Sequence, residues 1–184
     1  MLVKECMELA AVRLGVEDSL QAYYDNCNTL EDAKKVELLL TCFNIVENEL
    51  ALDYFPLLAE DTLTSAGGVI EFSALKKAAI RITKVTDEWG NSVPYQLFPA
   101  YLKTQPGKVR VTYTYTPEKK ELSGTSDFSS AVSTRLIADG MAAEYTLATG
   151  LFEEHAVWDK KYKESIAAAY KARPCRKMRS RRWA

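Results

Sequence analysis

The stretch PGKVRVTYTYTP, residues 106–117, decides the fold prediction. Its Pro-Gly pair predicts a tight turn, because proline presets one backbone angle and glycine accepts a positive one. After the turn, valine and tyrosine occupy every second position through Tyr115, and arginine and threonine occupy the positions between them. Successive side chains of a strand point to opposite faces, so this alternation predicts a half-buried antiparallel strand from Lys108 to Thr116.

Residues 57–117 as a whole have the composition of a β-sheet module, rich in Val, Ile, Thr, Tyr and Phe with Gly and Pro between the runs. We expect strands at 69–72 and 79–85, and a turn at 89–91. The Gly-Gly pair at 67–68 precedes a strand rather than a helix, so it predicts a turn and not a phosphate-binding loop. Together with the first strand, these signals predict a small sheet of about four strands.

Helical periodicity precedes this module. Apolar residues recur at helical spacing from the N-terminus until Gly15, which is expected to end the first helix. Asp18 or Ser19 is expected to cap a short second helix. The run TLED at 29–32 resembles a capping box that opens a longer helix, which Pro56 ends. The broad apolar stripe on that helix indicates burial against two neighbours.

Two further helices are expected after the module. Asp127 is placed to cap the first of them, and Thr149-Gly150 closes it. Gly140 interrupts the middle of this helix at a cost of about 1 kcal/mol relative to alanine, and the alanines around it predict a close helix crossing. Asp159 and Lys163 in the last helix have the i,i+4 spacing of a stabilising ion pair.

These elements predict an α+β fold, in which a helical bundle carries an inserted small antiparallel β-sheet module and an extended basic C-terminal arm. The expected divisions are N-terminal helices at 1–56, the β-module at 57–117, C-terminal helices that complete the bundle at 118–172, and the arm at 173–184. The helices on the two sides of the insertion are the natural packing partners of each other.

Charge is unevenly distributed along the chain. The whole chain has a net charge of −1, but residues 1–170 hold 17 of the 24 Lys and Arg and all 25 Asp and Glu. This part therefore carries −8, and the final stretch KARPCRKMRSRRWA carries +7. Such an asymmetry predicts a basic arm that seeks an anionic partner.

The cysteines and the histidine do not have the spacing of a zinc site. Cys6, Cys27, Cys42 and Cys175 form no C-x-x-C pair, and His155 is the one histidine of the chain. Cys27 and Cys42 lie on apolar helical faces and are expected in the core. The charged N-terminus does not resemble a signal peptide, so we expect free thiols in a reducing compartment. No apolar run reaches the ~18–20 residues of a membrane span, and no membrane association is expected.

The motifs of common enzyme classes are missing, and we expect neither catalysis nor a bound cofactor or metal. The sequence contains no G-x-x-x-x-G-K-[ST], no G-x-G-x-x-G and no G-x-S-x-G. His155 lies beside Glu153 and Glu154, but neighbours on a helix point in different directions, which favours a structural role over that of a general base. The acid pairs at 60–61 and 87–88 are expected in solvent, because sequence neighbours seldom converge on one substrate.

Aromatic residues of the β-module are candidates for either core or interface. Tyrosine and tryptophan suit interfaces because they combine a large rigid surface with a polar tip. For Tyr113 and Tyr115 the alternation favours the core of the sheet. For Trp89, which lies in a turn, core and interface stay equally open. Tyr95 and Tyr101 complete the set of candidate partner-binding aromatics in the module.

The C-terminal arm has two interpretations, a solvated end that aids solubility or a segment that becomes ordered on docking. Arginine predominates in it, and arginine makes bidentate contacts with carboxylate and phosphate. A tryptophan near the very end favours a groove on a protein over bare nucleic acid, because a purely electrostatic arm has no use for it. The candidate partner-binding residues of the arm are Arg173, Arg176, Lys177, Arg179, Arg181, Arg182 and Trp183.

The order of these parts resembles the head–tail connector proteins of tailed bacteriophages, also called adaptor or head-completion proteins. The likeness lies in YLKTQPGKVRVTYTYTPEKKEL, then the Ala-rich helix STRLIADGMAAEYTLATG, then FEEHAVWDKKYKESIAAAYKA, and a basic arm that closes in RSRRW. It covers most of residues 30–184 as a pattern of elements and residue types. The four cysteines and Gly140 are not features of that pattern.

The resemblance implies a homo-oligomeric ring, expected to hold twelve subunits, in the neck of the virion between capsid and tail, assembled in the host cytoplasm. Arg173 to Trp183 would then grip the portal protein. Trp89 and Tyr95 to Tyr101 would face a neighbouring subunit or a downstream tail or neck protein. Genomic DNA would pass through the lumen without sequence-specific binding. Ring closure requires that two different faces of each copy meet.

Two alternatives remain from the residues themselves. The first is a nucleic-acid-binding protein that holds phosphates with its basic tail, which predicts an affinity for DNA that falls steeply with salt. The −8 charge of the rest of the chain opposes this alternative. The second is a small enzyme whose site follows no recognised motif, which a deep pocket with converging polar groups would favour.

Overall fold

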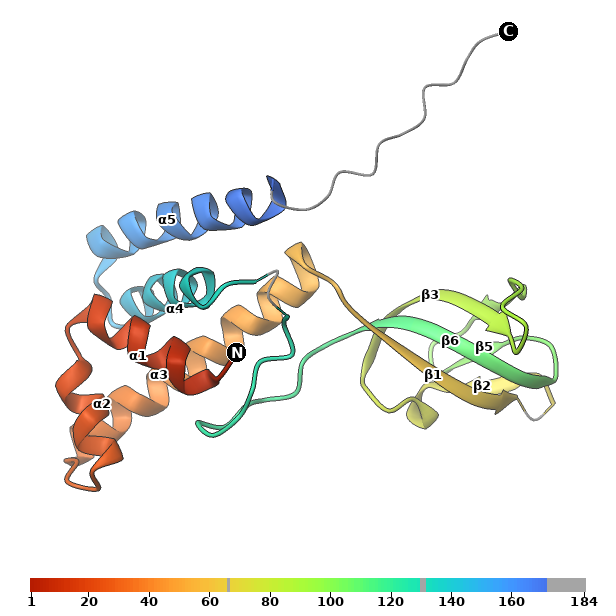
Figure 1. Ribbon diagram of the computed structural model, residues 1–184, viewed down its shortest axis with the longest axis horizontal. Helices are drawn as coiled ribbons and strands as arrows, with labels where there is room; N and C mark the ends of the chain where they lie inside the picture. The colour runs from red at the N-terminus through yellow and green to blue at the C-terminus, as the bar shows by residue number, and fades with distance from the viewer. Residues whose placement is uncertain (66, 130–131, 172–184) are drawn as a thin grey trace, which may run out of the picture. The chain divides into compact units, whose positions relative to one another are not determined.

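The computed structural model describes residues 1–65, 67–129 and 132–171, and the fold over these residues is mixed α+β. It contains five α-helices and two antiparallel sheets of three strands each (Figure 1). The α+β prediction is therefore confirmed. The chain divides into two compact units, which we call the helical unit, residues 1–46 with 120–184, and the strand unit, residues 47–119. The predicted arm lies outside the described residues.

Two predicted helix boundaries in the helical unit are confirmed, the end of the first helix and the start of the third. Gly15 takes a left-handed conformation, with φ of 66°, and its N–H donates to the Ala11 carbonyl to close the first helix. A capping box opens the third helix, since the Asp32 N–H donates to Thr29 Oγ1 and the Thr29 N–H donates to the Asp32 carboxylate. The helices are α1 (Val3–Leu14), α2 (Glu17–Tyr24), α3 (Leu30–Glu49), α4 (Thr134–Ala148) and α5 (Phe152–Lys171).

The predicted cap of α2 is wrong. Val16 occupies the N-cap position and makes no side-chain capping bond, while Asp18 lies inside the first turn. Ser19 instead hydrogen-bonds the Asp32 carboxylate at the start of α3. Hydrogen bonds from Thr29 and Ser19 together lower the pKa of Asp32 to about 2. The serine thus supports the neighbouring helix rather than its own.

The predicted start of α4 is also wrong. Ser133 caps this helix, because its hydroxyl accepts from the Leu136 N–H at 3.2 Å. Asp127 instead receives Lys120 Nζ at 2.6 Å across the polar loop. Phe128, which a helix capped by Asp127 would include, is instead buried within the loop segment that precedes α4.

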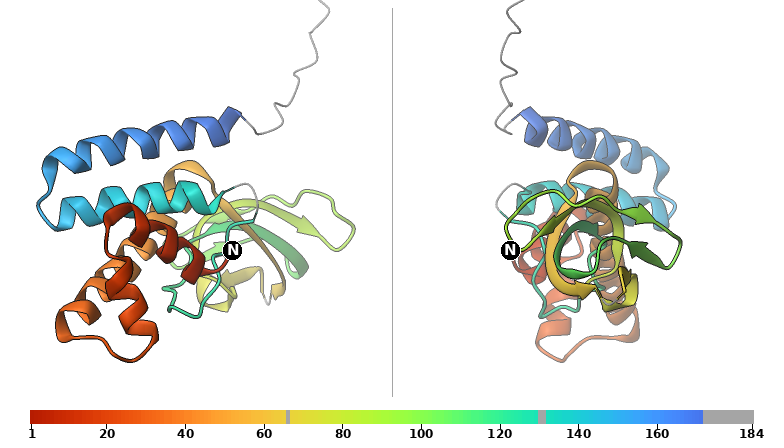
Figure 2. Two further views of the ribbon diagram at one scale, coloured as in Figure 1. Left: turned by 60° about the vertical axis from the view of Figure 1, so that its left-hand side comes forward. Right: turned by 90° about the vertical axis from the view of Figure 1, so that its right-hand side faces the viewer.

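Gly140 marks a close helix crossing, as predicted. A Cβ at this position would lie 2.8 Å from Tyr162 Cε2 of α5 and 2.8 Å from Val46 Cγ1 of α3. Helices α4 and α5 lie side by side in both views of Figure 2, joined by the turn at Gly150. A side chain larger than hydrogen at 140 would therefore separate three helices at once.

The apolar stripe of α3 is narrower than the sequence predicts. Phe43 and Val46 are fully buried, whereas Ile45 is exposed. The helix continues without a break into one π-helical turn, Leu50–Tyr54, before Pro56. Proline lacks the N–H that another turn would need, so Pro56 marks the end of the helical path.

The strand unit contains more strands than predicted. Two three-stranded sheets replace the expected single sheet of about four strands, with strand orders β1-β6-β3 and β2-β5-β4 and every pairing antiparallel. The predicted strand at 69–72 ends at Glu71, and Phe72 opens a short 3₁₀ turn. The strands are β1 (Leu57–Ser65), β2 (Val69–Glu71), β3 (Ala79–Asp87), β4 (Gln96–Leu97), β5 (Tyr101–Lys103) and β6 (Gly107–Tyr115).

Strand β6 supplies the core of the strand unit, as the alternation in the opening stretch predicts. Tyr113 and Tyr115 are buried, which confirms the core interpretation for both. Ile70 of β2 and Leu102 of β5 join the same hydrophobic cluster, so the two sheets share one core. The strands curl around it in the right-hand view of Figure 2.

Candidate interaction surfaces and polar networks

The turn after β3 presents Trp89 to solvent. Asp87 organises this turn, because its Oδ1 accepts the N–H groups of Trp89 at 3.0 Å and Asn91 at 2.8 Å. Its Oδ2 accepts the side-chain amide of Asn91 at 3.0 Å. Gly90 supplies the positive φ of 87° that the turn requires. The tryptophan that this framework holds is 78 % exposed.

The hydrogen bonds of this turn also fix the charge of its carboxylate. Desolvation alone would raise the pKa of Asp87, but the donors from Asn91, Trp89 and Gly90 outweigh it and lower the pKa. The turn therefore keeps its shape at neutral pH. Between core and interface, the two interpretations that the sequence left open for Trp89, the structure excludes the core. The hydrogen bonds of the turn fix its backbone and leave the Trp89 side chain in solvent.

A second aromatic surface lies on the β2-β5-β4 sheet. The rings of Phe98 and Tyr101 stack with centroids 4.7 Å apart. Tyr95 is half-buried, and Leu97, two residues further along the chain, is exposed. A shallow cavity of ≈ 520 Å³ adjoins these strands, lined by Pro94, Tyr95, Gln96, Lys103 and Thr104. Phe98 and Leu97 were not singled out by sequence reasoning, although they sit between the two predicted tyrosines in the run YQLFPAY.

Behind these surfaces, a buried polar network stabilises the strand unit. The Tyr113 hydroxyl donates to Asp61 Oδ2 at 2.7 Å, and the Lys76 N–H donates to the same oxygen at 2.9 Å. The Lys77 N–H donates to the Tyr113 oxygen at 3.2 Å. Burial would raise the pKa of Asp61, but the donors from Lys76 and Tyr113 lower it. Burial and Asp61 raise the pKa of Tyr113, which stays protonated.

This network also separates the acid pair at 60–61. Asp61 points into the unit, whereas Glu60 points outward and lies 3.2 Å from Arg110 Nε. Adjacent residues on a strand face opposite sides of a sheet, so the two carboxylates cannot act on one substrate. The expectation that both acids of this pair lie in solvent is wrong for Asp61, which is 4 % exposed because it accepts hydrogen bonds from Tyr113 and Lys76 inside the unit.

The network predicts a pH-dependent effect of Tyr113→Phe. We expect a loss of about 1–3 kcal/mol in the free energy of unfolding at neutral pH, because Asp61 loses a buried donor. A carboxylate with a lowered pKa stabilises the fold above its unfolded pKa of about 3.9 and loses that contribution as pH falls. The gap between variant and wild type should therefore narrow below about pH 4.

Urea unfolding across this pH range measures that gap. Tyr23→Phe, on the exposed surface of α2, is the matched control and should track the wild type at every pH. A gap that stayed constant down to about pH 2 would mean that Tyr113 acts independently of the Asp61 charge.

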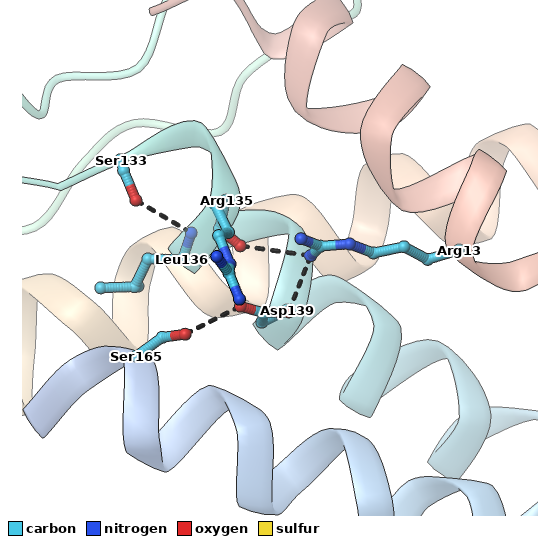
Figure 3. Close-up of polar contacts among 6 residues, drawn as sticks. All are labelled: Arg13, Ser133, Arg135, Leu136, Asp139 and Ser165. Carbon is cyan, nitrogen blue, oxygen red and sulfur yellow. Dashed lines mark hydrogen bonds and ion pairs between the residues drawn. The ribbon is translucent and has the colours of Figure 1, made fainter. Parts of the chain in front are cut away.

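In the helical unit, a second buried network surrounds Asp139 of α4 (Figure 3). Its Oδ1 lies 2.8 Å from Arg13 of α1, and its Oδ2 accepts the hydroxyl of Ser165 of α5 at 2.8 Å. Arg13 also donates to the main-chain carbonyl of Arg135 at 3.2 Å, while the Arg135 side chain reaches Asp139 at 3.9 Å. Three helices are thus joined through one carboxylate that is 4 % exposed.

The pKa of Arg13 reflects both its burial and its charged neighbours. Burial lowers the pKa of Arg13, Asp139 raises it, and the neighbouring Arg135 lowers it further. The guanidinium also lies over the Trp158 ring, 5.7 Å from its centroid. Sequence reasoning missed this network, since Arg13 and Ser165 come from distant segments and no local motif links them to Asp139.

A groove of ≈ 430 Å³ lies along α4 and α5 beside this network. It is lined by Ser133, Arg135, Leu136, Asp139, Lys161, Glu164, Ser165, Ala168 and Ala169. Its most buried polar groups, Asp139 and Ser165, bond each other, and the Ser133 hydroxyl caps α4. The lining residues include no Cys or His. The hydrogen bonds of Asp139, Ser165 and Ser133 join helices α4 and α5 or cap α4.

The structure also shows the surroundings of the histidine and of two of the cysteines. His155 Nδ1 lies 2.9 Å from the Ala143 carbonyl, which holds the ring against α4. Cys42 is buried, and burial with nearby Glu144 raises the pKa of its thiol to about 12. Cys27 is exposed, so its predicted core position is wrong. Over residues 1–65, 67–129 and 132–171, no group of three His, Cys, Asp or Glu is arranged to hold a metal ion.

Two further findings concern the chain as a whole. None of the described helices combines the length and apolarity needed to cross a bilayer. The predicted partner-binding residues of the arm, from Arg173 to Trp183, lie outside the described part of the chain. The other predicted partner-binding residues, Trp89, Tyr95 and Tyr101, are described by the structure and lie on the strand unit.

No protein-family model matches the chain, and a search of curated proteins returns no match.

Proposed function

We propose that this chain is a structural subunit of the ring that connects the head and the tail of a tailed bacteriophage, and that it is not an enzyme. In this proposal the five helices form a bundle and the strand unit is a module inserted into it. The basic arm at 173–184 extends from the bundle and docks on the portal protein. The subunit belongs to the neck of the virion, is assembled in the host cytoplasm, and surrounds the path of the genomic DNA.

The exposed Trp89 is the observation that carries this proposal. Trp89 is 78 % exposed, and the hydrogen-bonded turn that carries it orders the backbone before any partner binds, which lowers the cost of ordering on binding. Tryptophan is among the residues that most often dominate the free energy of a protein interface. Its position favours a chain that works through contact with other proteins, here a neighbouring subunit or a tail component.

The composition of the surface supports the same proposal. Tyr101 with Phe98 forms a stacked aromatic pair on the strand unit, and Leu97 next to it is exposed. Aromatic residues are enriched in interfaces, whereas solvated surfaces are mostly polar. The basic arm adds arginines and Trp183, which suit a groove on a protein partner.

The proposal predicts that Trp89→Ala weakens assembly without unfolding the chain. The loss of a central tryptophan costs about 2 kcal/mol of binding free energy, or roughly 30-fold in affinity. Because the side chain is solvated in the free subunit, the midpoint of thermal unfolding should stay within about one degree of the wild type.

The probe is the portal protein encoded in the same genome, together with the tail protein encoded beside it. Mass photometry of the mixture counts the copies bound to each portal ring and records capture of the tail protein. Asn91→Ala, in the same turn, is a control that loosens the turn and keeps the tryptophan. If Trp89→Ala changed neither the copy number nor the capture, the assigned role of Trp89 would be wrong.

A further inference from the structure

The outer face of the β1-β6-β3 sheet gathers four basic side chains. Lys108 and Arg110 of β6 point away from the core, opposite the buried valines of the alternation. Arg81 and Lys84 of β3 pair with residues of β6 that share this outward face. All four side chains are exposed. We call these residues, Arg81, Lys84, Lys108 and Arg110, the cationic face.

The cationic face keeps a positive excess after its internal pairing. Glu60 of β1 lies on the same outer side and pairs with Arg110 at 3.2 Å. Threonines of β1 and β6 fill most of the positions between the charges. Hydroxyl groups carry no charge, so the face retains three basic side chains whose field is not offset by Glu60.

Exposed aliphatic side chains on β1 and β3 favour a protein partner over a phosphate backbone. Leu58 of β1 is 63 % exposed and lies opposite Thr114, the residue that also pairs with Arg81. Ile80 precedes Arg81 at a bulge and is also exposed. Aliphatic groups gain free energy by burial against other apolar groups, and phosphates offer none.

The helical unit of the same chain carries the complementary charge. Residues 14–33 contain five Asp or Glu and no Lys or Arg. Three of these acids, Glu17, Asp18 and Asp25, are exposed on α2 and at its end. We call these three residues the acidic face. Its three negative charges are opposite in sign to the three basic side chains in excess on the cationic face, and equal to them in number.

The acidic face also borders a place for an aliphatic side chain. A hollow of ≈ 150 Å³ opens between α1 and α2, lined by Glu17 together with Val12, Leu20 and Tyr24 among others. Val12 is exposed at its edge. The Tyr24 hydroxyl is buried there with no hydrogen-bond partner among the described residues, and burial with Glu8 raises its pKa to about 12.

We propose that the cationic face of one copy docks on the acidic face of the next copy, with Leu58 entering the hollow between α1 and α2. The inference rests on the ring proposed above and names the two faces that close it. Because the faces differ, the contact is heterologous and repeats from copy to copy into a ring or filament. Charge complementarity makes this contact stronger at low salt.

The test combines two charge-reversal variants of the full chain. One carries Arg81→Glu and Lys84→Glu on the cationic face, and the other carries Glu17→Lys and Asp18→Lys on the acidic face. Each reversal is expected to weaken self-association at least 100-fold at about 0.05 M salt, because like charges then meet across the contact. Far-UV circular dichroism checks that these exposed substitutions leave both variants folded.

Mixing the two variants gives the sharpest result. Each variant keeps the face that the other has lost, and the two reversed faces carry opposite charges, so both contacts between unlike copies are attractive. Sedimentation velocity should therefore show larger assemblies in the equimolar mixture than in either variant alone. Leu58→Ala in the wild-type background should weaken association by about tenfold through the lost apolar burial. Thr62→Ala on the same strand is the matched control.

Other occupants give different outcomes, and each would overturn the inference. A wild type that stays monomeric at about 0.05 M salt and binds duplex DNA through Arg81 and Lys84 would make the face a phosphate site. Association lost in the acidic-face variant alone would make the basic arm its occupant. Association unchanged in both variants, or a mixture that stays monomeric, would exclude the pairing of these faces.

Capture of the portal protein by the same preparations separates this inference from the proposed function. Association restored in the mixture without any portal capture would leave the inference standing and remove the connector role. Portal capture by variants whose self-association is unchanged would overturn the pairing of the two faces and leave the connector role standing.

Discussion

Asp139→Ala is expected to destabilise the helical unit by about 3 kcal/mol. Removing one partner of a buried ion pair costs about 3–5 kcal/mol, because the other charge remains without compensation. Arg13 keeps 17 % of its side chain exposed, so water can reach it and the loss should fall at the low end of that range. Ser165 loses its acceptor as well. Because the Asp139 carboxylate joins three helices, the substitution should cause a cooperative loss of helical signal.

Urea unfolding followed by circular dichroism at 222 nm measures this loss. Arg135→Ala is the matched control, since its side chain is 80 % exposed and 3.9 Å from Asp139, and it should cost less than about 1 kcal/mol. The double variant Arg13→Met with Asp139→Leu should recover much of the stability, because an apolar pair carries no uncompensated charge. Equal losses for Asp139→Ala and Arg135→Ala would contradict the role of the buried carboxylate.

Gly140→Val is expected to destabilise the helical unit by about 3 kcal/mol, the upper range for added volume in a packed core. Its Cβ alone would lie 2.8 Å from Tyr162 Cε2 and from Val46 Cγ1, and valine adds two methyl groups. Removing a helical glycine by itself favours the helix by roughly 1 kcal/mol. The steric cost exceeds that gain because both neighbours are buried and cannot move independently.

A double-mutant cycle isolates this crossing. Val46→Ala removes one of the two atoms that meet residue 140, so it should offset part of the loss caused by Gly140→Val. Ala167→Val on the exposed side of α5 is the control for a larger side chain in a helix and should change stability by less than about 0.5 kcal/mol. Additive losses at 46 and 140 would show that the two positions do not share a packing constraint.

The sequence correctly predicted those elements that depend on interactions between residues close together in the chain. The capping box at Thr29 and Asp32 needs residues three apart, and the alternation around Tyr113 needs one strand. Gly140 was recognised as a crossing point because small residues cluster around it. In each case the interaction depends on the chain within a few residues, or on the mere absence of a side chain.

Elements that depend on distant residues were not predicted. Strand β1 has the sequence LLAEDTLTS, in which Glu60 and Asp61 interrupt the alternation of apolar and polar residues. The structure shows why these acids are tolerated, because Glu60 pairs with Arg110 and Asp61 accepts a hydrogen bond from Tyr113. The sequence predicted the start of α4 too early, because Asp127 pairs with Lys120 and Ser133 caps the helix instead.

The candidate surfaces were predicted in part. Trp89 was recognised as a candidate, but its exposure could not be derived from the sequence, since a turn can fold inward or outward. The cationic face was present as the second half of the alternation, at the positions between the valines and tyrosines. Its meaning depends on the register of β3 against β6, which sets Arg81 and Lys84 beside it and which no single strand reveals.

The connector account depends most on the arm at 173–184, whose loss should abolish assembly and spare the fold. The measurement is the mass of the portal ring after mixing with the full chain or with a chain truncated after Ala172. The full chain should add the mass of a ring of subunits, and the truncated chain, with the same helical signal and unfolding midpoint, should add none. A truncated chain that loaded the portal as fully as the intact one would contradict the account.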